Sequence, residues 1–213
     1  MVDAVHQHGA LASIQLHHGG AHALRRLSRE PAFSPSGLAS ELPPPAFPPG
    51  TPRVMTQEDI DRVQLAFVDA ALRARDVGYD VVDVLAGYGY LAAQFLSPFH
   101  NQRTDRYGGS LESRARFWLE TLSRVRDAVG ADCAIATRVA IQTDGPWGHT
   151  VDDTVALVRM ADSLVDVWNL NLGSVLDWGS DISPPRTVPE GRNLELLGWY
   201  AGLRVNPTWE CRD

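Results

Sequence analysis

One arginine of this sequence stands where a charge could take part in chemistry. Arg138 is the last residue of the run CAIATR, within an apolar segment at 133–139 that has the composition of a buried strand. Burying a guanidinium is costly unless it is paired or serves a ligand. Arg138 is therefore a candidate binding residue, and pairing with a neighbouring carboxylate is the alternative interpretation.

Histidines are the second group that could do chemistry, because imidazoles close in sequence can converge on zinc. Five of them lie near the start of the chain: His6, His8, His17, His18 and His22. A zinc-binding pair at i and i+4, such as His18 and His22, would need a helix, which Gly19 and Gly20 interrupt. We predict a loop and no metal site here, with zinc binding as the less favoured alternative.

The composition excludes several classes of function. The chain has 213 residues, 44% of them hydrophobic, and a net charge of -7, which suits one sizeable core and disfavours nucleic acid and anionic lipid as partners. All 19 positive charges are arginines, so lysine-dependent Schiff-base and P-loop chemistries are excluded. Cys133 and Cys211 form no disulfide framework, and no segment resembles a signal peptide or a membrane span. We expect a cytoplasmic protein that binds neither nucleic acid nor membranes.

Short apolar runs alternate with segments of helical periodicity. We predict strands at 10–16, 80–85, 133–139 and 166–172, and helices at 56–77, 110–129, 151–164 and 193–203. Strict alternation of strand and helix indicates a parallel sheet with helices outside it. A closed (β/α)8 TIM barrel needs eight strands and about 250 residues. The predicted fold is therefore α/β, a partial TIM barrel of about four to five β/α units.

A proline-rich connector separates the first strand from the first long helix. Eight prolines between residues 23 and 54 forbid a regular helix or a central strand: Pro31, Pro35, Pro43, Pro44, Pro45, Pro48, Pro49 and Pro52. Loops of this length are usually functional or disordered. We expect an excursion over the surface or across the barrel mouth.

The strand at 80–85 runs into a polar loop and then a helix, which is how a β/α barrel builds an active-site wall. The loop crowds side chains that can hydrogen-bond one another: Asn101, Arg103, Asp105 and Tyr107. Gly108 and Gly109 then turn the chain into a helix that Ser110 opens. We expect a salt-bridged structural loop without a catalytic task.

These segments carry a family resemblance. The run SPFHNQRTDRYGGSLESRARF resembles the signature of the Old Yellow Enzyme flavin oxidoreductases, and RFWLETLSRVRDAVGADCAIATR resembles their trimethylamine, dimethylamine and histamine dehydrogenase branch. The resemblance implies a single incomplete FMN-binding TIM-barrel domain over 1–213, with strands one, two, seven and eight missing. It also implies that Gln15 and Arg138 bind the pyrimidine edge of FMN.

The segment LAGYGYL, residues 85–91, departs from most of the family. Old Yellow Enzyme relatives place a histidine where Leu85 stands and a histidine or asparagine where Tyr88 stands, and this pair holds a carbonyl oxygen of the substrate. Leucine cannot donate a hydrogen bond. Tyr88 keeps a polar group and is a candidate catalytic residue, with a packed aromatic whose hydroxyl is tied to a neighbour as the alternative.

The segment Asp177–Asp181 resembles a motif of the amine dehydrogenase branch. By that resemblance Trp178 lines an aromatic bowl for the substrate and Asp181 completes the catalytic set. Aromatic faces attract a substituted ammonium, and a carboxylate beside it stabilises or deprotonates the cation. Without the resemblance, Trp178 would be a packing residue and Asp181 a loop cap.

The sequence therefore predicts a fragment of an FMN-dependent oxidoreductase that oxidises a small amine by hydride transfer to the flavin. The alternatives are an NAD(P)H-dependent ene reductase and a non-catalytic remnant. The partner is a small-molecule substrate, the electron acceptor is unspecified, and the resemblance allows a homo-oligomer. An iron–sulfur cluster belongs only to full-length relatives, since its cysteines are absent here. The fragment alone is expected to be inactive.

Overall fold

The computed structural model describes residues 1–24, 29–39, 51–140 and 150–171. Its main sheet has four parallel strands in the order β1-β4-β5-β6: Ser13–Leu16 (β1), Val81–Ala86 (β4), Ala134–Ala140 (β5) and Val167–Asn171 (β6). Successive strands of this sheet are neighbours in it, as in consecutive β/α units of a barrel. The predicted parallel α/β architecture is confirmed, and the helix predicted at 193–203 lies outside the described residues.

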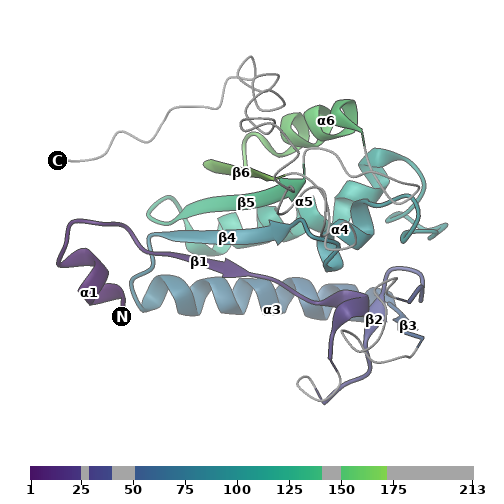
Figure 1. Cartoon of the computed structure of the whole chain (residues 1–213), viewed down its shortest axis with the longest axis horizontal. Helices are drawn as coiled ribbons and strands as arrows, with labels where there is room; N and C mark the ends of the chain where they lie inside the picture. Colours follow the sequence, from purple (N-terminus) through teal and green to yellow (C-terminus); the bar gives the residue numbers. More distant parts are fainter. Residues whose placement is uncertain (25–28, 40–50, 141–149, 172–213) are drawn as a thin grey trace, which may run out of the picture.

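Three long helices accompany the sheet: α3 (Gln57–Asp76), α5 (Leu111–Val129) and α6 (Val151–Ala161). In Figure 1, α3 runs alongside β1 and α5 lies behind β4 and β5. The core forms between these helices and one face of the sheet, where Phe117, Trp118 and Val84 are almost completely buried. Figure 1 also shows that the C-terminal ends of β1, β4 and β5 point toward α4 and the β2–β3 pair.

Local sequence signals set the helix ends. The Thr56 hydroxyl accepts the Asp59 N–H while the Asp59 side chain accepts the Thr56 N–H, so α3 begins with the predicted capping box. Ser110 caps α5 in the predicted way by accepting the Ser113 N–H. Gly78, just after α3, has a φ of +93°, which glycine tolerates and other residues rarely adopt.

The structure adds elements that the sequence patterns did not predict: α1 (Val2–His6), the 3₁₀ turn η1 (Gly20–His22), β2 (Phe33–Ser34), β3 (Arg53–Val54) and α4 (Leu91–Leu96). All are too short to show a period. β2 and β3 pair in parallel inside the proline-rich connector, so the two ends of that connector lie side by side. The strand predicted at 10–16 begins only at residue 13, and the helix predicted at 151–164 ends at residue 161.

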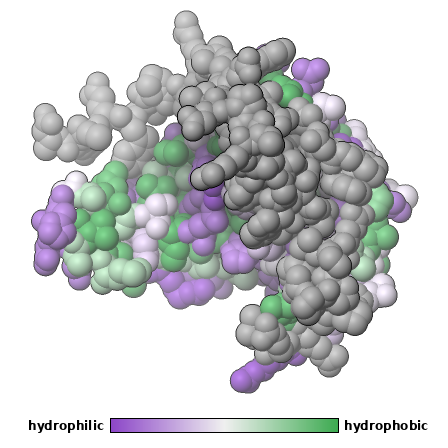
Figure 2. Space-filling view, viewed as in Figure 1, coloured by the Kyte–Doolittle hydropathy of each residue, from purple (hydrophilic) through white to green (hydrophobic). Residues whose placement is uncertain are grey.

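Hydrophobic and hydrophilic residues are mixed on the visible described surface in Figure 2. A few large hydrophobic side chains are exposed, among them Met1, Leu11, Leu65 and Val77. Across the described ranges, each helix is too short or too polar to cross a lipid bilayer.

Candidate active site

A row of polar side chains lies on the sheet face that points away from the helices. Side chains alternate along a strand, and Val82 and Val84 of β4 belong to the core, so Asp83 and Leu85 point the other way. In the strand register, Gln15 lies beside Asp83 and Arg138 lies beside Leu85. The described part of the chain thus brings Gln15, Asp83 and Arg138 to the same face.

Asp83 links the two predicted cofactor-binding residues. Gln15 Nε2 donates a 2.8 Å hydrogen bond to Asp83 Oδ2. Only 6% of Asp83 is exposed, and this burial raises the pKa of its carboxyl group, against the opposing effects of the Gln15 hydrogen bond and the Arg138 charge. Among the described residues, Asp83 Oδ1 and Arg138 Nε are buried and have no hydrogen-bond partner. Buried polar atoms of this kind are expected where a ligand completes the site.

Tyr88 lies against Arg138. The guanidinium carbon is 4.8 Å from the centre of the tyrosine ring, within the range of a cation–π contact. Tyr88 has a φ of +58°, a left-handed conformation that costs a non-glycine residue roughly 1–2 kcal/mol. Such strain is retained when the surroundings fix the residue, and it often occurs at functional sites.

Gly87 allows the chain to reach this position. A Cβ atom on Gly87 would lie 3.1 Å from Asn171 Oδ1 and 3.5 Å from the Arg138 carbonyl oxygen. The first distance is tighter than most real contacts, so a side chain would push the β4 loop away from β5 and β6. The lack of a side chain at Gly87 therefore permits the close approach of the chain to β5 and β6 just before Tyr88. Trp178 and Asp181, the other predicted site residues, lie outside the described residues.

Comparisons with known proteins place the chain in a family. The sequence profile of the NADH:flavin oxidoreductase / NADH oxidase family matches residues 1–196. The chain is 41% identical to dimethylamine dehydrogenase of Hyphomicrobium sp. (strain x) over 198 residues, which are 89% of this chain and 26% of that protein. It is 37% identical to an NADPH dehydrogenase of Geobacillus thermodenitrificans (strain NG80-2), covering 89% of this chain and 53% of the relative.

The chain belongs to the NADH:flavin oxidoreductase / NADH oxidase family. A solved structure of histamine dehydrogenase from Rhizobium sp. 4-9 is 35% identical and superimposes with a TM-score of 0.83, covering 92% of this chain and 28% of that one. The chain thus spans about a quarter of the length of these amine dehydrogenases. The fold is part of the TIM barrel of Old Yellow Enzyme relatives, and members of this family are FMN-dependent oxidoreductases that act on small molecules.

The described residues fit FMN. A flavin pyrimidine edge needs hydrogen-bond partners and a positive charge, because negative charge accumulates near N1 and the C2 carbonyl on reduction. The Gln15 amide is exposed, and Arg138 carries the buried Nε that lacks a partner among the described residues. These donors lie toward the C-terminal ends of their strands, where barrel enzymes build their active sites.

Leu85 gives the site an apolar position. Only 3% of Leu85 is exposed, and it lies next to Arg138 in the register. No hydrogen bond can come from this side chain. Asp83 is the site residue that the sequence analysis missed. Its signal was present, since it is the only charged residue among 81–86, but this apolar run does not show which face it occupies.

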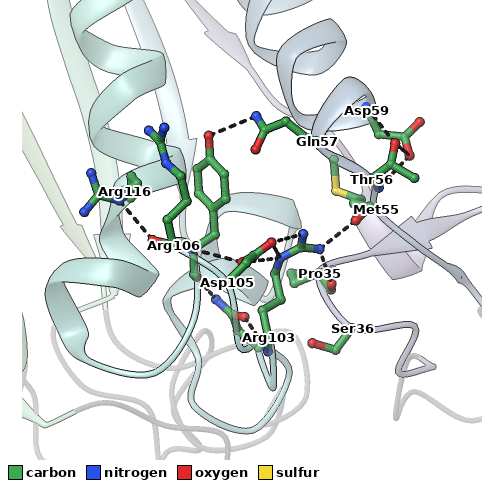
Figure 3. A network of polar contacts seen from close by, with 12 residues as sticks. Pro35, Ser36, Met55, Thr56, Gln57, Asp59, Arg103, Asp105, Arg106 and Arg116 are labelled. Atoms are coloured by element: carbon green, nitrogen blue, oxygen red, sulfur yellow. Dashed lines mark hydrogen bonds and ion pairs between the residues drawn. The ribbon is translucent and has the colours of Figure 1, made fainter.

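The loop after α4 is a polar network that joins three parts of the fold (Figure 3). Asn101 Nδ2 donates 2.7 Å hydrogen bonds to the carbonyl oxygens of Phe95 and Tyr107, and the Tyr107 hydroxyl donates to Glu120 at 2.9 Å. Arg103 pairs with Asp105 as the sequence suggested. Arg106 pairs with Glu120 of α5. These partners lie within the protein, as expected of a structural loop.

The N-terminal histidines pack with aromatic rings. His18 stacks on Phe33 with ring centres 4.8 Å apart, and His22 meets the Tyr90 ring edge-on at 5.9 Å. Burial is the main reason why the pKa values of His18 and His22 fall from 6.5 to about 4. In the described ranges, no three His, Cys, Asp or Glu side chains are arranged to hold a metal ion.

These two histidines predict acid sensitivity. The unfolded chain binds protons at both residues below about pH 6.5, whereas the folded chain binds them only near pH 4. The stability that depends on keeping these two histidines neutral is therefore fully present above pH 6.5 and is lost as the pH falls toward 4. Between pH 7 and pH 5 we expect a loss of about 1–2 kcal/mol for each histidine, measured by urea unfolding. The variant His18→Phe should lose less on acidification, and an equal loss would contradict this assignment.

A pocket of about 270 Å³ lies between β1 and α3, and Gln15 is one of its lining residues. Its walls include Leu16 of β1 and Val63 and Phe67 of α3, so it lies on the helix side of the sheet. We assign the candidate active site to the opposite face because that face carries Asp83 and Arg138.

Proposed function

We propose that the protein carrying this chain oxidises small amines with FMN as its cofactor. The observation that carries the proposal is the polar row in which Gln15 and Arg138 share one sheet face, with Tyr88 against the guanidinium. Similarity to dimethylamine dehydrogenase and to the histamine dehydrogenase structure supports the choice of amines. When bound, FMN would supply a ring that accepts hydride from a C–H bond next to nitrogen.

Different residues of the chain would bind the cofactor and the substrate. Arg138 would hold positive charge where the pyrimidine edge becomes negative, and Gln15 would bind and orient that edge. Tyr88 would contact the substrate. We further propose that Trp178 offers an aromatic face to a substituted ammonium and that Asp181 stabilises or deprotonates it.

Leu85 favours an amine over an activated alkene. Ene reduction needs donors that polarise a carbonyl oxygen, and by the family resemblance a leucine at this position removes one of the two expected donors. An ene reductase nevertheless remains the second candidate, because the NADPH dehydrogenase of Geobacillus thermodenitrificans shares 37% identity with the chain.

We also propose that residues 1–213 are one incomplete barrel domain. Barrel phosphate sites are usually built by the loops after strands seven and eight, which we place beyond this chain. The isolated chain would then bind FMN weakly and turn over no substrate. A completed barrel is the form in which the activity is expected.

An anaerobic assay on the protein with a completed barrel separates these functions. Dimethylamine or trimethylamine should bleach the visible absorbance of bound FMN, whereas NADPH followed by cyclohexenone should give no net turnover. Turnover of the enone without bleaching by any amine would establish the ene reductase instead. A purified protein that takes up no FMN would contradict both and support a non-catalytic remnant.

A further inference from the structure

We propose that Asp83 is a positioning residue that fixes the Gln15 amide with its oxygen directed at the flavin. This inference rests on the proposed FMN site and assigns a task in it to Asp83. Asp83 lies between the two predicted flavin contacts. It accepts a 2.8 Å hydrogen bond from Gln15, and the nearby charge of Arg138 acts to lower the pKa of its carboxyl group.

Asp83 is held in place by its neighbours in the sheet. In the strand register it lies between Gln15 of β1 and Ala136 of β5, and the small alanine leaves room on that side. Only 6% of Asp83 is exposed, so water cannot freely replace the Gln15 hydrogen bond. A buried side chain bonded at this distance restricts the rotation of its partner.

The orientation follows from the donors and acceptors. An ionised carboxylate only accepts hydrogen bonds, whereas an amide has an NH₂ group at one end and an oxygen at the other. Gln15 must therefore present its NH₂ group to Asp83, since the flipped amide would place two oxygens against each other. Burial raises the pKa of the Asp83 carboxyl overall, whereas the Gln15 hydrogen bond and the nearby Arg138 oppose this rise and favour the ionised carboxylate that this arrangement requires.

The fixed amide matches a flavin edge. With one N–H bonded to Asp83, Gln15 keeps its Oε1 acceptor and its second N–H donor for a ligand. The pyrimidine edge of a flavin has an N3–H donor between two carbonyl acceptors. An acceptor and a donor held side by side can bind N3–H and an adjacent carbonyl together, which a freely rotating amide would do only part of the time.

The unpaired oxygen of Asp83 is a second observation. Asp83 Oδ1 is buried and has no partner of good hydrogen-bond geometry within the described part of the chain, although the nearby Arg138 backbone lowers the pKa of the carboxyl group. A carboxylate kept in this state is costly, and a residue needed only for packing would be expected as an apolar side chain. Its retention on the binding face is consistent with a task performed on Gln15.

The test measures the affinity of FMN for variants of the protein with a completed barrel. Ligand-detected NMR is suitable because it also detects weak binding. Asp83→Asn keeps the shape but can present either end of its amide to Gln15, so we expect FMN to bind about tenfold more weakly. Asp69→Asn is the matched control, because Asp69 is an exposed carboxylate on α3 that makes no contact with the site. Equal FMN affinity in both variants would overturn the inference.

A double-mutant cycle separates positioning from general damage. If Asp83 acts through Gln15, then Gln15→Leu and the double variant Q15L/D83N should bind FMN within twofold of each other. If D83N fails to fold, Q15L is compared with Q15L/D83L, which removes the carboxylate without stranding the amide. A tenfold difference within either pair would contradict the proposal. If the unmodified protein with a completed barrel binds no FMN, the proposed function itself fails.

Discussion

Replacing Arg138 by methionine is expected to weaken FMN binding by about 10- to 100-fold. A hydrogen bond from a charged group contributes about 1.5–3 kcal/mol, and every 1.4 kcal/mol is a factor of ten in affinity. The loss should be larger for reduced FMN, because we propose that the guanidinium faces the edge where negative charge accumulates. A further tenfold loss for the reduced form would lower the two-electron midpoint potential by about 30 mV. Titration with FMN and spectroelectrochemistry, both on the protein with a completed barrel, measure the two effects.

Two other arginine variants make this result specific. Arg159 is exposed on α6, so Arg159→Met removes the same charge without touching the polar row. Arg138→Lys keeps the charge but loses the planar guanidinium that lies over Tyr88, and should fall between the unmodified protein and R138M. If R138M binds FMN as R159M does, Arg138 merely pairs within the protein and is no flavin contact.

The sequence predicted the main sheet because its signals are local. Thr56 with Asp59 forms a capping box within four residues, and the apolar run of β4 needs no distant partner to be recognised as a buried strand. The predicted boundary of a strand was wrong where the apolar run continues beyond the strand. The predicted first strand included Ala12, which instead bonds its N–H to the carboxylate of Asp80 at the strand entrance.

The candidate site depends on relations that composition does not encode. Gln15 and Asp83 are 68 residues apart, and only the register of β1 with β4 places them on one face. Tyrosine has no preference for the left-handed backbone of Tyr88, which depends on the close approach of Gly87 to β5 and β6. The pairing of β2 with β3 likewise joins residues of the proline-rich connector that are far apart in the sequence. The apolar run around Arg138 marked it as a candidate and family resemblance supplied Gln15, whereas Asp83 emerged only from the three-dimensional arrangement.

The second large effect is expected on stability, when the polar network of the loop after α4 is broken. Arg103 donates to the carbonyl oxygens of Pro35 at 2.8 Å and Met55 at 2.6 Å, and it pairs with Asp105 at 2.5 Å (Figure 3). Its side chain is only 10% exposed. Arg103 therefore connects the loop after α4 to the residue that follows β2 and to the residue that precedes the α3 cap.

Arg103→Met is expected to destabilise the chain by about 3–5 kcal/mol, because it leaves two carbonyl groups and a carboxylate without their shared donor. Arg124→Met is the matched control. Arg124 is exposed on α5, and its ion pair with Asp61 is long, at 3.9 Å. Its loss should therefore cost less than about 0.5 kcal/mol. Urea unfolding at pH 7 measures both variants. A loss in R103M as small as that in R124M would mean that water replaces these hydrogen bonds, and that the family signature loop does not hold the barrel mouth together.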